Sequence, residues 1–120
     1  MDVKDIYHEI IGSAFEVQRI LGTGYLETVY QHALSFELSL RDISVELEKH
    51  IEVLYKGRIV GLYRADLVVD NRIIIETKCV SSIIADHIYQ LKNYLTGTGY
   101  TLGYIFNFKN SSVDFKKVFP

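Results

Sequence analysis

The stretch RIIIETKC, residues 72–79, carries the strongest structural signal of the chain. Its three consecutive isoleucines, residues 73–75, predict a strand covered on both faces, as at the centre of a sheet. Glu76 and Lys78 follow two residues apart, so both project from one face of that strand. Charges on a covered strand are costly unless they pair or bind something. Taken alone, they fit an internal ion pair or a strand end that reaches solvent as well as a functional site.

Hydrophobic periodicity on either side of this strand predicts a mixed α/β (α+β) fold, with a central sheet flanked by helices. One helix separates the third and fourth strands, which can therefore be parallel. The length of 120 residues argues for a single domain over 1–120. The expected elements, in order, are helices over 3–21 and 26–40, strands over 45–55, 59–69 and 72–79, a helix from Ser81 or Ser82 to about Leu95, and strands over 100–108 and 113–119.

Composition excludes several classes of function. The net charge of −2 and the pI of about 6.1 are not those of a strong nucleic-acid binder, so such a partner needs a local basic patch or a metal bridge. The single cysteine, Cys79, excludes an internal disulfide and a cysteine-based zinc site, and it fits a reducing, cytoplasmic location. No apolar run approaches the roughly 20 residues that span a membrane, and residues 1–5 lack the profile of a signal peptide.

Asp66 strengthens the functional interpretation of the charged pair. It lies near the end of an otherwise apolar strand, which the turn at residues 70–71 folds against the strand of Glu76. A strict two-residue loop would pair Asp66 with Ile75 and place the two carboxylates on opposite faces. A three-residue loop or a bulge would bring them onto one face. A metal site therefore requires a longer loop or a bulge at this turn.

Two adjacent carboxylates repel each other, and a cation relieves that repulsion. Mg²⁺ and Mn²⁺ prefer oxygen ligands, usually a few carboxylates and waters. A lysine beside them can orient or deprotonate the water, or offset negative charge in the transition state. We therefore expect Asp66 and Glu76 to hold Mg²⁺ or Mn²⁺, with Lys78 acting on the water.

Both helices next to these strands offer further polar side chains. Glu27 shares a helical face with Tyr30, and it needs a partner unless it only complements the helix N-terminus. On the later helix His87, Gln90 and Tyr94 share one face, which points at the site or packs as an ordinary amphipathic surface. The earlier helix also carries an apolar row, Val29, Ala33, Phe36 and Leu40, which Tyr30, Leu34 and Leu38 widen.

These residues together resemble a known family. The segment Gly24-Tyr25-Leu26-Glu27-Thr28-Val29-Tyr30 matches the motif of the GxxExxY proteins, which resemble the PD-(D/E)XK nuclease fold with its αβββαβ core. Gln90-xxx-Tyr94 is similar to the QxxxY motif of RecB-type exonucleases. The family often has a glycine after its Asn-Phe pair, where this chain has Lys109, so the loop there can differ. The similarity continues through Tyr55, Gly57, Asp66, Glu76-Thr77-Lys78, His87, residues 90–95 and residues 103–108.

The resemblance implies a Mg²⁺- or Mn²⁺-dependent nuclease that hydrolyses phosphodiester bonds in DNA or RNA. Asp66 and Glu76 are then metal ligands, Lys78 is the catalytic lysine, and Glu27 is an acidic residue of the site that adds a ligand or accepts a proton. The alternative is a non-catalytic interaction module, or scaffold, that retains the nuclease fold, which the small size and mild acidity favour. A homo-oligomer or a larger assembly could supply further binding surface. The residues expected to line the site are Tyr30, His87, Gln90 and Tyr94.

Overall fold

The computed structural model describes residues 3–120, so Met1 and Asp2, which belong to the segment examined for a signal peptide, lie outside it. Every predicted helix and strand is present, in the predicted order. Within this range no helix is long and apolar enough to cross a membrane. The elements are α1 (Val3–Leu21), α2 (Glu27–Leu40), β1 (Val45–Tyr55), β2 (Arg58–Val69), β3 (Ile73–Lys78), α3 (Ala85–Thr98), β4 (Leu102–Asn107) and β5 (Asp114–Val118).

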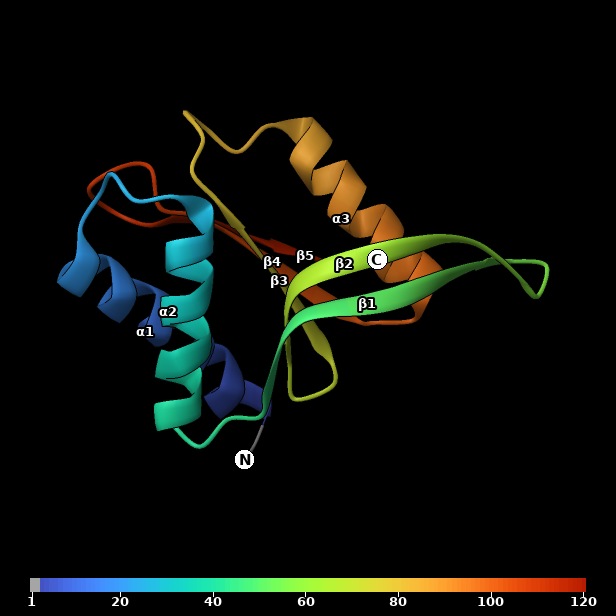
Figure 1. Cartoon of the computed structure of the whole chain (residues 1–120), viewed down its shortest axis with the longest axis horizontal. Coiled ribbons are helices and arrows are strands. Elements are labelled where there is room, and N and C mark those ends of the chain that lie inside the picture. Colours follow the sequence, from blue (N-terminus) through green and yellow to red (C-terminus); the bar gives the residue numbers. More distant parts are fainter. Residues whose placement is uncertain (1–2) are drawn as a thin grey trace.

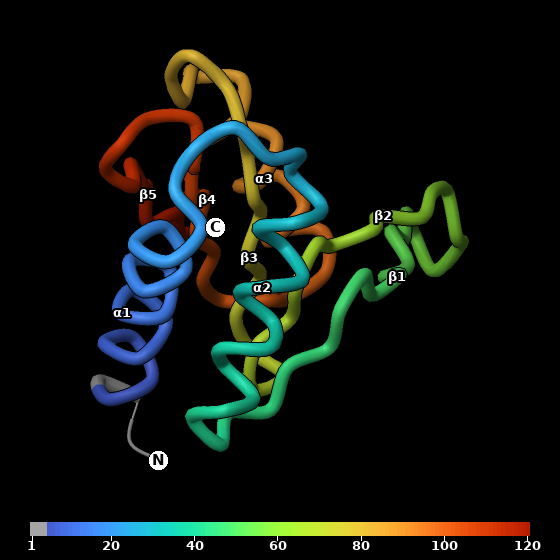
Figure 2. The backbone as a smooth tube through the Cα atoms, turned by 60° about the vertical axis from the view of Figure 1, so that its left-hand side comes forward, coloured from blue at the N-terminus to red at the C-terminus, as the bar shows by residue number. Residues whose placement is uncertain are grey.

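One mixed sheet organises the molecule, with its strands in the order β1-β2-β3-β4-β5. Neighbouring strands are antiparallel except β3 and β4, which are parallel, as the intervening helix α3 predicted. Helices α1 and α2 cover one face of the sheet and α3 covers the other (Figures 1 and 2). The predicted α/β fold with a central sheet flanked by helices is confirmed.

Strand β3 is the buried centre of this arrangement. Ile73 and Ile75 belong to the apolar core under α1 and α2, whereas Ile74 belongs to a second core under α3. All three are buried, which confirms the prediction of a strand covered on both faces. Since burying one isoleucine contributes about 1.5–3 kcal/mol, β3 is firmly anchored. The two charged residues at its end, Glu76 and Lys78, therefore start from a rigid backbone.

Strands β1 and β2 form a long hairpin that bends away from the rest of the sheet (Figures 1 and 2). The pairing of β2 with β3 ends at Leu67 and Ile75. At the same level Glu48 of β1 has a φ of 53°, and the β1–β2 ladder omits the position of Glu48 and Asp66. Ala65 packs in the core under α3 but Leu67 packs in the core under α1 and α2. Residues two apart would share a face of a regular strand, so β2 is kinked at Asp66.

The start of α3 differs from the prediction. The helix begins at Ala85 and not at a cap formed by Ser81 or Ser82. The N-cap residue is Ile84, whose main-chain N–H donates to His87 Nδ1 at 3.1 Å, whereas a capping serine would have accepted an N–H of the first turn through its own hydroxyl. At its other end α3 stops at Gly99, whose φ of 81° gives the left-handed conformation that glycine adopts readily.

Gly103 allows α3 to lie close against β4. A Cβ at this position would stand 2.8 Å from Leu91 Cδ2 and 3.2 Å from Leu95 Cδ1. Both leucines belong to the core under α3 and are buried. The missing side chain therefore sets the depth at which α3 packs on the sheet, and with it the position of the helix face that looks towards Glu76.

Candidate active site

The turn between β2 and β3 brings Asp66 level with Glu76. Val69 pairs with Ile73, so residues 70–72 form a three-residue loop. The first two of these take positive φ values of 54° and 55°, which the aspartate and asparagine at these positions tolerate. The ladder ends one step before Asp66 and Glu76, and the main-chain N–H of Asp66 lies close enough to the Glu76 carboxyl to lower its pKa. The longer loop that a metal site requires is therefore present.

Asp66 takes the place of a main-chain acceptor at the point where β2 leaves β3. The N–H of Thr77 donates to Asp66 Oδ2 at 2.9 Å, and the Thr77 hydroxyl donates to the same oxygen at 3.2 Å. Burial raises the pKa of the Asp66 carboxyl, and the two bonds from Thr77 oppose that shift. These bonds fix the carboxylate beside the end of β3.

Glu76 is the most perturbed carboxyl of the site. Its side chain is partly buried, and within the described part of the chain its Oε1, sealed from solvent, has no hydrogen-bond partner. Burial raises the pKa of Glu76 to about 8, although the charge of Lys78 and the main-chain N–H of Asp66 lower it. A buried carboxylate without a partner is unstable unless it is protonated or meets a cation. At neutral pH Glu76 therefore holds a proton that a cation could replace.

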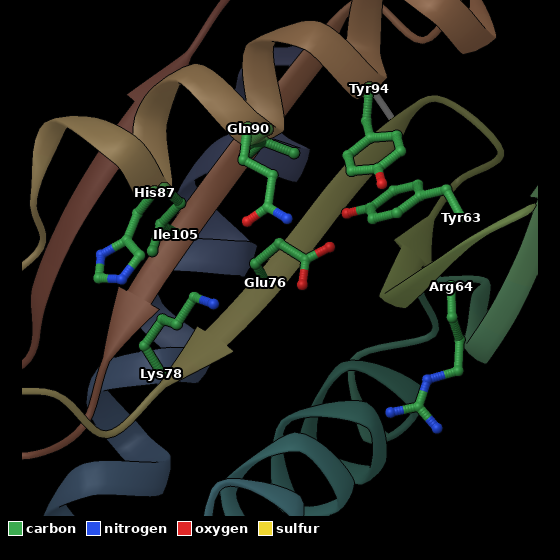
Figure 3. A pocket seen from close by; sticks show the side chains of 9 residues that line it. Tyr63, Arg64, Glu76, Lys78, His87, Gln90, Tyr94 and Ile105 are labelled. Atoms are coloured by element: carbon green, nitrogen blue, oxygen red, sulfur yellow. The ribbon is translucent and has the colours of Figure 1, made fainter. Parts of the chain in front are cut away.

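A pocket of about 270 Å³ opens over Glu76, between β2, β3 and α3. Figure 3 shows Glu76 at its centre, with the ammonium group of Lys78 and the amide of Gln90 on either side. The structure describes no ion pair between Glu76 and Lys78, so a simple internal salt bridge does not explain the two charges. The lining residues are Tyr63, Arg64, Glu76, Lys78, His87, Gln90, Leu91, Tyr94 and Ile105.

The face of α3 predicted from its spacing does meet this pocket. His87, Gln90 and Tyr94 all line it, and the side chain of Gln90 points towards Glu76 (Figure 3). His87 already accepts the N–H of Ile84 through Nδ1, which leaves Nε2 as the ring nitrogen for a ligand. The helix thus contributes an amide, an imidazole and a phenol to a pocket whose floor carries the charged residues of β3.

Sequence reasoning missed Tyr63 of β2, which lines the pocket together with Arg64, a residue that the sequence placed beside the site without a definite role. The ring of Tyr63 stacks on that of Tyr94, with centroids 3.8 Å apart and planes 11° apart. In a regular strand Tyr63 would face away from Asp66, three residues later, and only the kink brings both to the site. Arg64 points away from Glu76 (Figure 3) and approaches Glu48 at 3.9 Å.

Glu27 stands beside the pocket and not in its lining. It is the first residue of α2 and is exposed, and its Oε1 accepts the N–H of Cys79 at 3.1 Å. Its negative charge raises the pKa values of both Asp66 and Glu76, so it lies near both carboxyls. The structure thus brings the three acids into one neighbourhood, with Glu27 at the outer edge.

Tyr30 does not line this pocket. It is fully buried in the core under α1 and α2, where its ring stacks on Phe108 with centroids 4.7 Å apart. Its hydroxyl donates to the main-chain oxygen of Gly22 at 2.6 Å. Tyr30 therefore holds the loop that leads into Glu27, where Gly24 has a φ of 104° that suits glycine. Its role is to place the start of α2 and not to meet a ligand.

The family of the chain follows from comparison with known sequences. Residues 4–118 match the PD-(D/E)XK nuclease superfamily. The chain belongs to this superfamily. Enzymes of the PD-(D/E)XK superfamily generally use divalent metal ions. No curated protein matches the sequence.

Two solved structures share this PD-(D/E)XK fold. The crystal structure of SSO0001 superposes with a TM-score of 0.58 at 21% identity, over 97% of this chain and 58% of its own. An alkaline exonuclease (LHK-Exo) from Laribacter hongkongensis gives a TM-score of 0.57 at 15% identity, over 89% of this chain and 66% of its own. The chain thus spans about three fifths to two thirds of these proteins. At such identities the likeness shows the fold alone.

The carboxyl groups of the site fit the divalent ion that PD-(D/E)XK membership implies. Asp66 and Glu76 lie next to each other, and Oε1 of Glu76 is an unpartnered oxygen that a cation could take as a ligand. Within the described residues no three His, Cys, Asp or Glu side chains form a ready-made metal cage. Mg²⁺ does not need one, because it is usually held by one or two carboxylates and several waters. Two carboxylates beside an open pocket meet that requirement.

Proposed function

We propose that this PD-(D/E)XK protein is a Mg²⁺- or Mn²⁺-dependent nuclease that hydrolyses phosphodiester bonds in DNA or RNA. The observation that carries the proposal is Glu76, whose Oε1 is sealed and unpartnered, in one pocket with Lys78 and next to Asp66, which does not itself line that pocket. Superfamily membership supports the reaction class, and one structure of similar fold is an exonuclease. An internal ion pair would not need a pocket with polar side chains around it.

The side chains have separate tasks in this proposal. Asp66 and Glu76 would hold the cation. When bound, such a cation lowers the pKa of a coordinated water and stabilises negative charge on a phosphate oxygen. Glu76 would release its proton when the cation binds, because burial keeps it protonated near neutral pH. Lys78 would orient the attacking water or offset the charge that develops on the phosphate. Glu27, at the outer edge, would accept a proton or add a ligand.

The residues of α3 would bind the substrate and not the cation. Gln90 offers amide N–H groups beside Glu76, and His87 offers the ring nitrogen that Ile84 does not use. Hydrogen bonds from such groups to phosphate oxygens position a nucleic acid without reading its sequence. Tyr94, stacked on Tyr63, would close the wall of the pocket next to Glu76.

Cleavage of labelled single- and double-stranded DNA and RNA tests this function. We expect cleavage by the wild type only with Mg²⁺ or Mn²⁺, and a loss of about 100-fold or more in Lys78→Ala and Glu76→Gln. Lys116→Ala, which removes an exposed lysine of β5, is the control and should cut like the wild type. Equal cleavage by Lys78→Ala and the wild type would disprove the role of Lys78.

A non-catalytic module that retains the fold is the second candidate. It is favoured by Glu27, whose carboxylate is engaged by the N–H of Cys79, and by the net charge of −2. Calorimetric titration of Mn²⁺ into the wild type and Glu76→Gln separates the two candidates. Binding that depends on Glu76 supports the enzyme, and its absence supports the module.

Three further expectations accompany the proposal and stay predictions. The motif Gly24–Tyr30 supports the expectation that the chain is one of the GxxExxY proteins within the superfamily. The single cysteine fits a cytoplasmic location. The two cores on one sheet support a single domain over residues 1–120.

A further inference from the structure

The exposed side of α2 carries an apolar stripe that the proposed nuclease site does not use. Leu26, just before the helix, is 76% exposed, and Val29, Phe36 and Leu40 are 37%, 66% and 63% exposed. Ala33 lies between them, is partly buried and packs at its inner side against the core under α1 and α2. The five residues are spaced three and four apart in turn, which is the a/d pattern of a helix that packs along another helix. Solvent-facing helix surfaces are normally polar, so this stripe needs an explanation.

Apart from Ala33 at its inner edge, the stripe is not the side by which α2 joins its own domain. The buried residues of α2 centre roughly 130° around the helix from the stripe. The apolar row Val29, Ala33, Phe36 and Leu40, which is the clearest pattern in the sequence of this helix, therefore belongs to the side that the fold leaves largely exposed. The residues that the fold buries are Tyr30, Gln31, Leu34 and Leu38.

We infer that the stripe is the contact between two copies of this chain, which pack α2 against α2 in antiparallel directions about a twofold axis at Ala33. Such an axis places Leu26 opposite Leu40 of the partner and Val29 opposite Phe36 of the partner. A small residue at the crossing lets the two helices approach closely. The stripe is thus complementary to itself, as the patch of a twofold dimer must be.

The charges around the stripe agree with a second copy as the occupant. The residues on its outer border include no Asp, Glu, Lys or Arg: they are Thr28, His32, Ser35 and Ser39. On its inner border Glu37 is neutralised by Arg41, whose Nε lies 2.9 Å from the carboxylate. No unpaired like charges would therefore meet when α2 packs on its copy. An exposed helix face with this composition is unusual for a surface that only contacts water.

This contact leaves the pocket over Glu76 free, and it comes near the proposed nuclease site only at Leu26, the neighbour of Glu27. Helix α2 covers the face of the sheet opposite to α3, whereas the pocket over Glu76 opens between α3 and the strands. Both pockets of a dimer would stay open. The contact extends over about 21 Å of helix at 1.5 Å per residue, which is short, so the flanking loops must add area to reach the roughly 800 Å² per partner of a stable interface. A dimer that dissociates in the micromolar range is expected.

Sedimentation velocity of the full chain tests the contact. We expect the wild type to be mostly dimeric at about 100 µM and to dissociate on dilution towards about 1 µM. Phe36→Lys should be monomeric throughout, with an unchanged circular-dichroism spectrum and thermal midpoint. Tyr89→Lys is the matched control, because Tyr89 of α3 is 62% exposed, and it should dimerise like the wild type. A wild type that stays monomeric would overturn the inference.

A dimer that survives Phe36→Lys would also overturn the inference, and Leu62→Lys would then test the exposed apolar residues of the β1–β2 hairpin as the interface. Cross-linking checks the direction of packing in a Cys79→Ser background, which removes the native thiol. Mixed Leu26→Cys and Leu40→Cys proteins should form a disulfide-linked heterodimer under mild oxidation, and neither should link to itself. Self-linking of Leu26→Cys alone would show parallel packing and contradict the twofold axis at Ala33.

Discussion

At the scale of single residues, Glu76 is a carboxyl group that the fold buries without giving its Oε1 a hydrogen-bond partner. The pKa of its carboxyl is about 8 in the folded chain, against an ordinary value of 4.5. Between these values the folded chain binds a proton that the unfolded chain has lost. The free energy of unfolding of the metal-free protein should therefore decrease as the pH rises from about 4.5 to about 8. The stabilisation that comes from the proton on Glu76 is fully present below about pH 4.5 and is lost above about pH 8.

Replacing Glu76 by glutamine removes this loss, because an amide does not titrate. We expect metal-free Glu76→Gln to gain stability over the wild type by roughly 1–3 kcal/mol at about pH 9, and much less at about pH 5. Urea unfolding in the presence of a chelator measures both values. Glu52→Gln, an exposed glutamate of β1, is the control and should show no such trend. A gain that is the same at both pH values would refute the role of burial.

At the scale of elements, each helix and strand could be predicted from the spacing of its apolar residues. A repeat of three and four residues fits a helix, and a repeat of two residues or a short apolar run fits a strand. The isoleucines of β3 are the clearest case, and the bounds of α1 and β1 match the prediction. The kink at Asp66 could not be predicted, because it depends on the positive φ of Glu48 across the ladder and not on local pattern. For the same reason Tyr63 was missed as a site residue.

The register of β2 on β3 could be predicted only as two alternatives. Residues Asp70 and Asn71 fit a two-residue turn as well as a longer loop, and the choice decides which face Asp66 takes. The start of α3 was misjudged because serine is a common cap, whereas here His87 supplies the acceptor. Local signals thus predicted which residues carry charge into the sheet, but not how the chain around them bends.

Packing of α3 on β4 provides a test at this scale. Gly103→Ala should destabilise the protein by about 1–3 kcal/mol, because the new methyl group would overlap Leu91 and force α3 outward. Gly61→Ala is a matched control in β2, where an added Cβ meets no atom within 4 Å, and it should change stability little. Chemical denaturation of both variants gives the difference. Equal stability of the two would show that α3 does not depend on the missing side chain.

At the scale of the whole molecule, the fold separates its surfaces by task. The pocket over Glu76 opens on the α3 side, and the apolar stripe of α2 lies on the other. The β1–β2 hairpin projects beyond both (Figure 1), and its segment 54–62 contains Lys56 and Arg58 but no acidic residue. A chain with a net charge of −2 needs such a local excess of positive charge, or a bound metal, to approach nucleic acid.

The hairpin tip should therefore hold part of the substrate of the proposed nuclease. The double variant Lys56→Glu and Arg58→Glu, made in the inactive Lys78→Ala protein, should bind DNA or RNA about tenfold more weakly in low salt. The slope of log affinity against log salt should fall by about two, one unit for each phosphate contact. Fluorescence anisotropy over a range of salt measures both quantities.

The matched control for the hairpin is Lys116→Glu, which reverses a charge on β5, at the opposite edge of the sheet from β1. Coulomb attraction decays within a Debye length of about 10 Å at 0.1 M salt, so a lysine at the far edge adds little to binding at the tip. If Lys116→Glu weakened binding as much as the hairpin variant, the effect would reflect net charge alone. If the hairpin variant bound like its parent, the nucleic acid would reach Glu76 along another path, and the exposed tip would need a different partner.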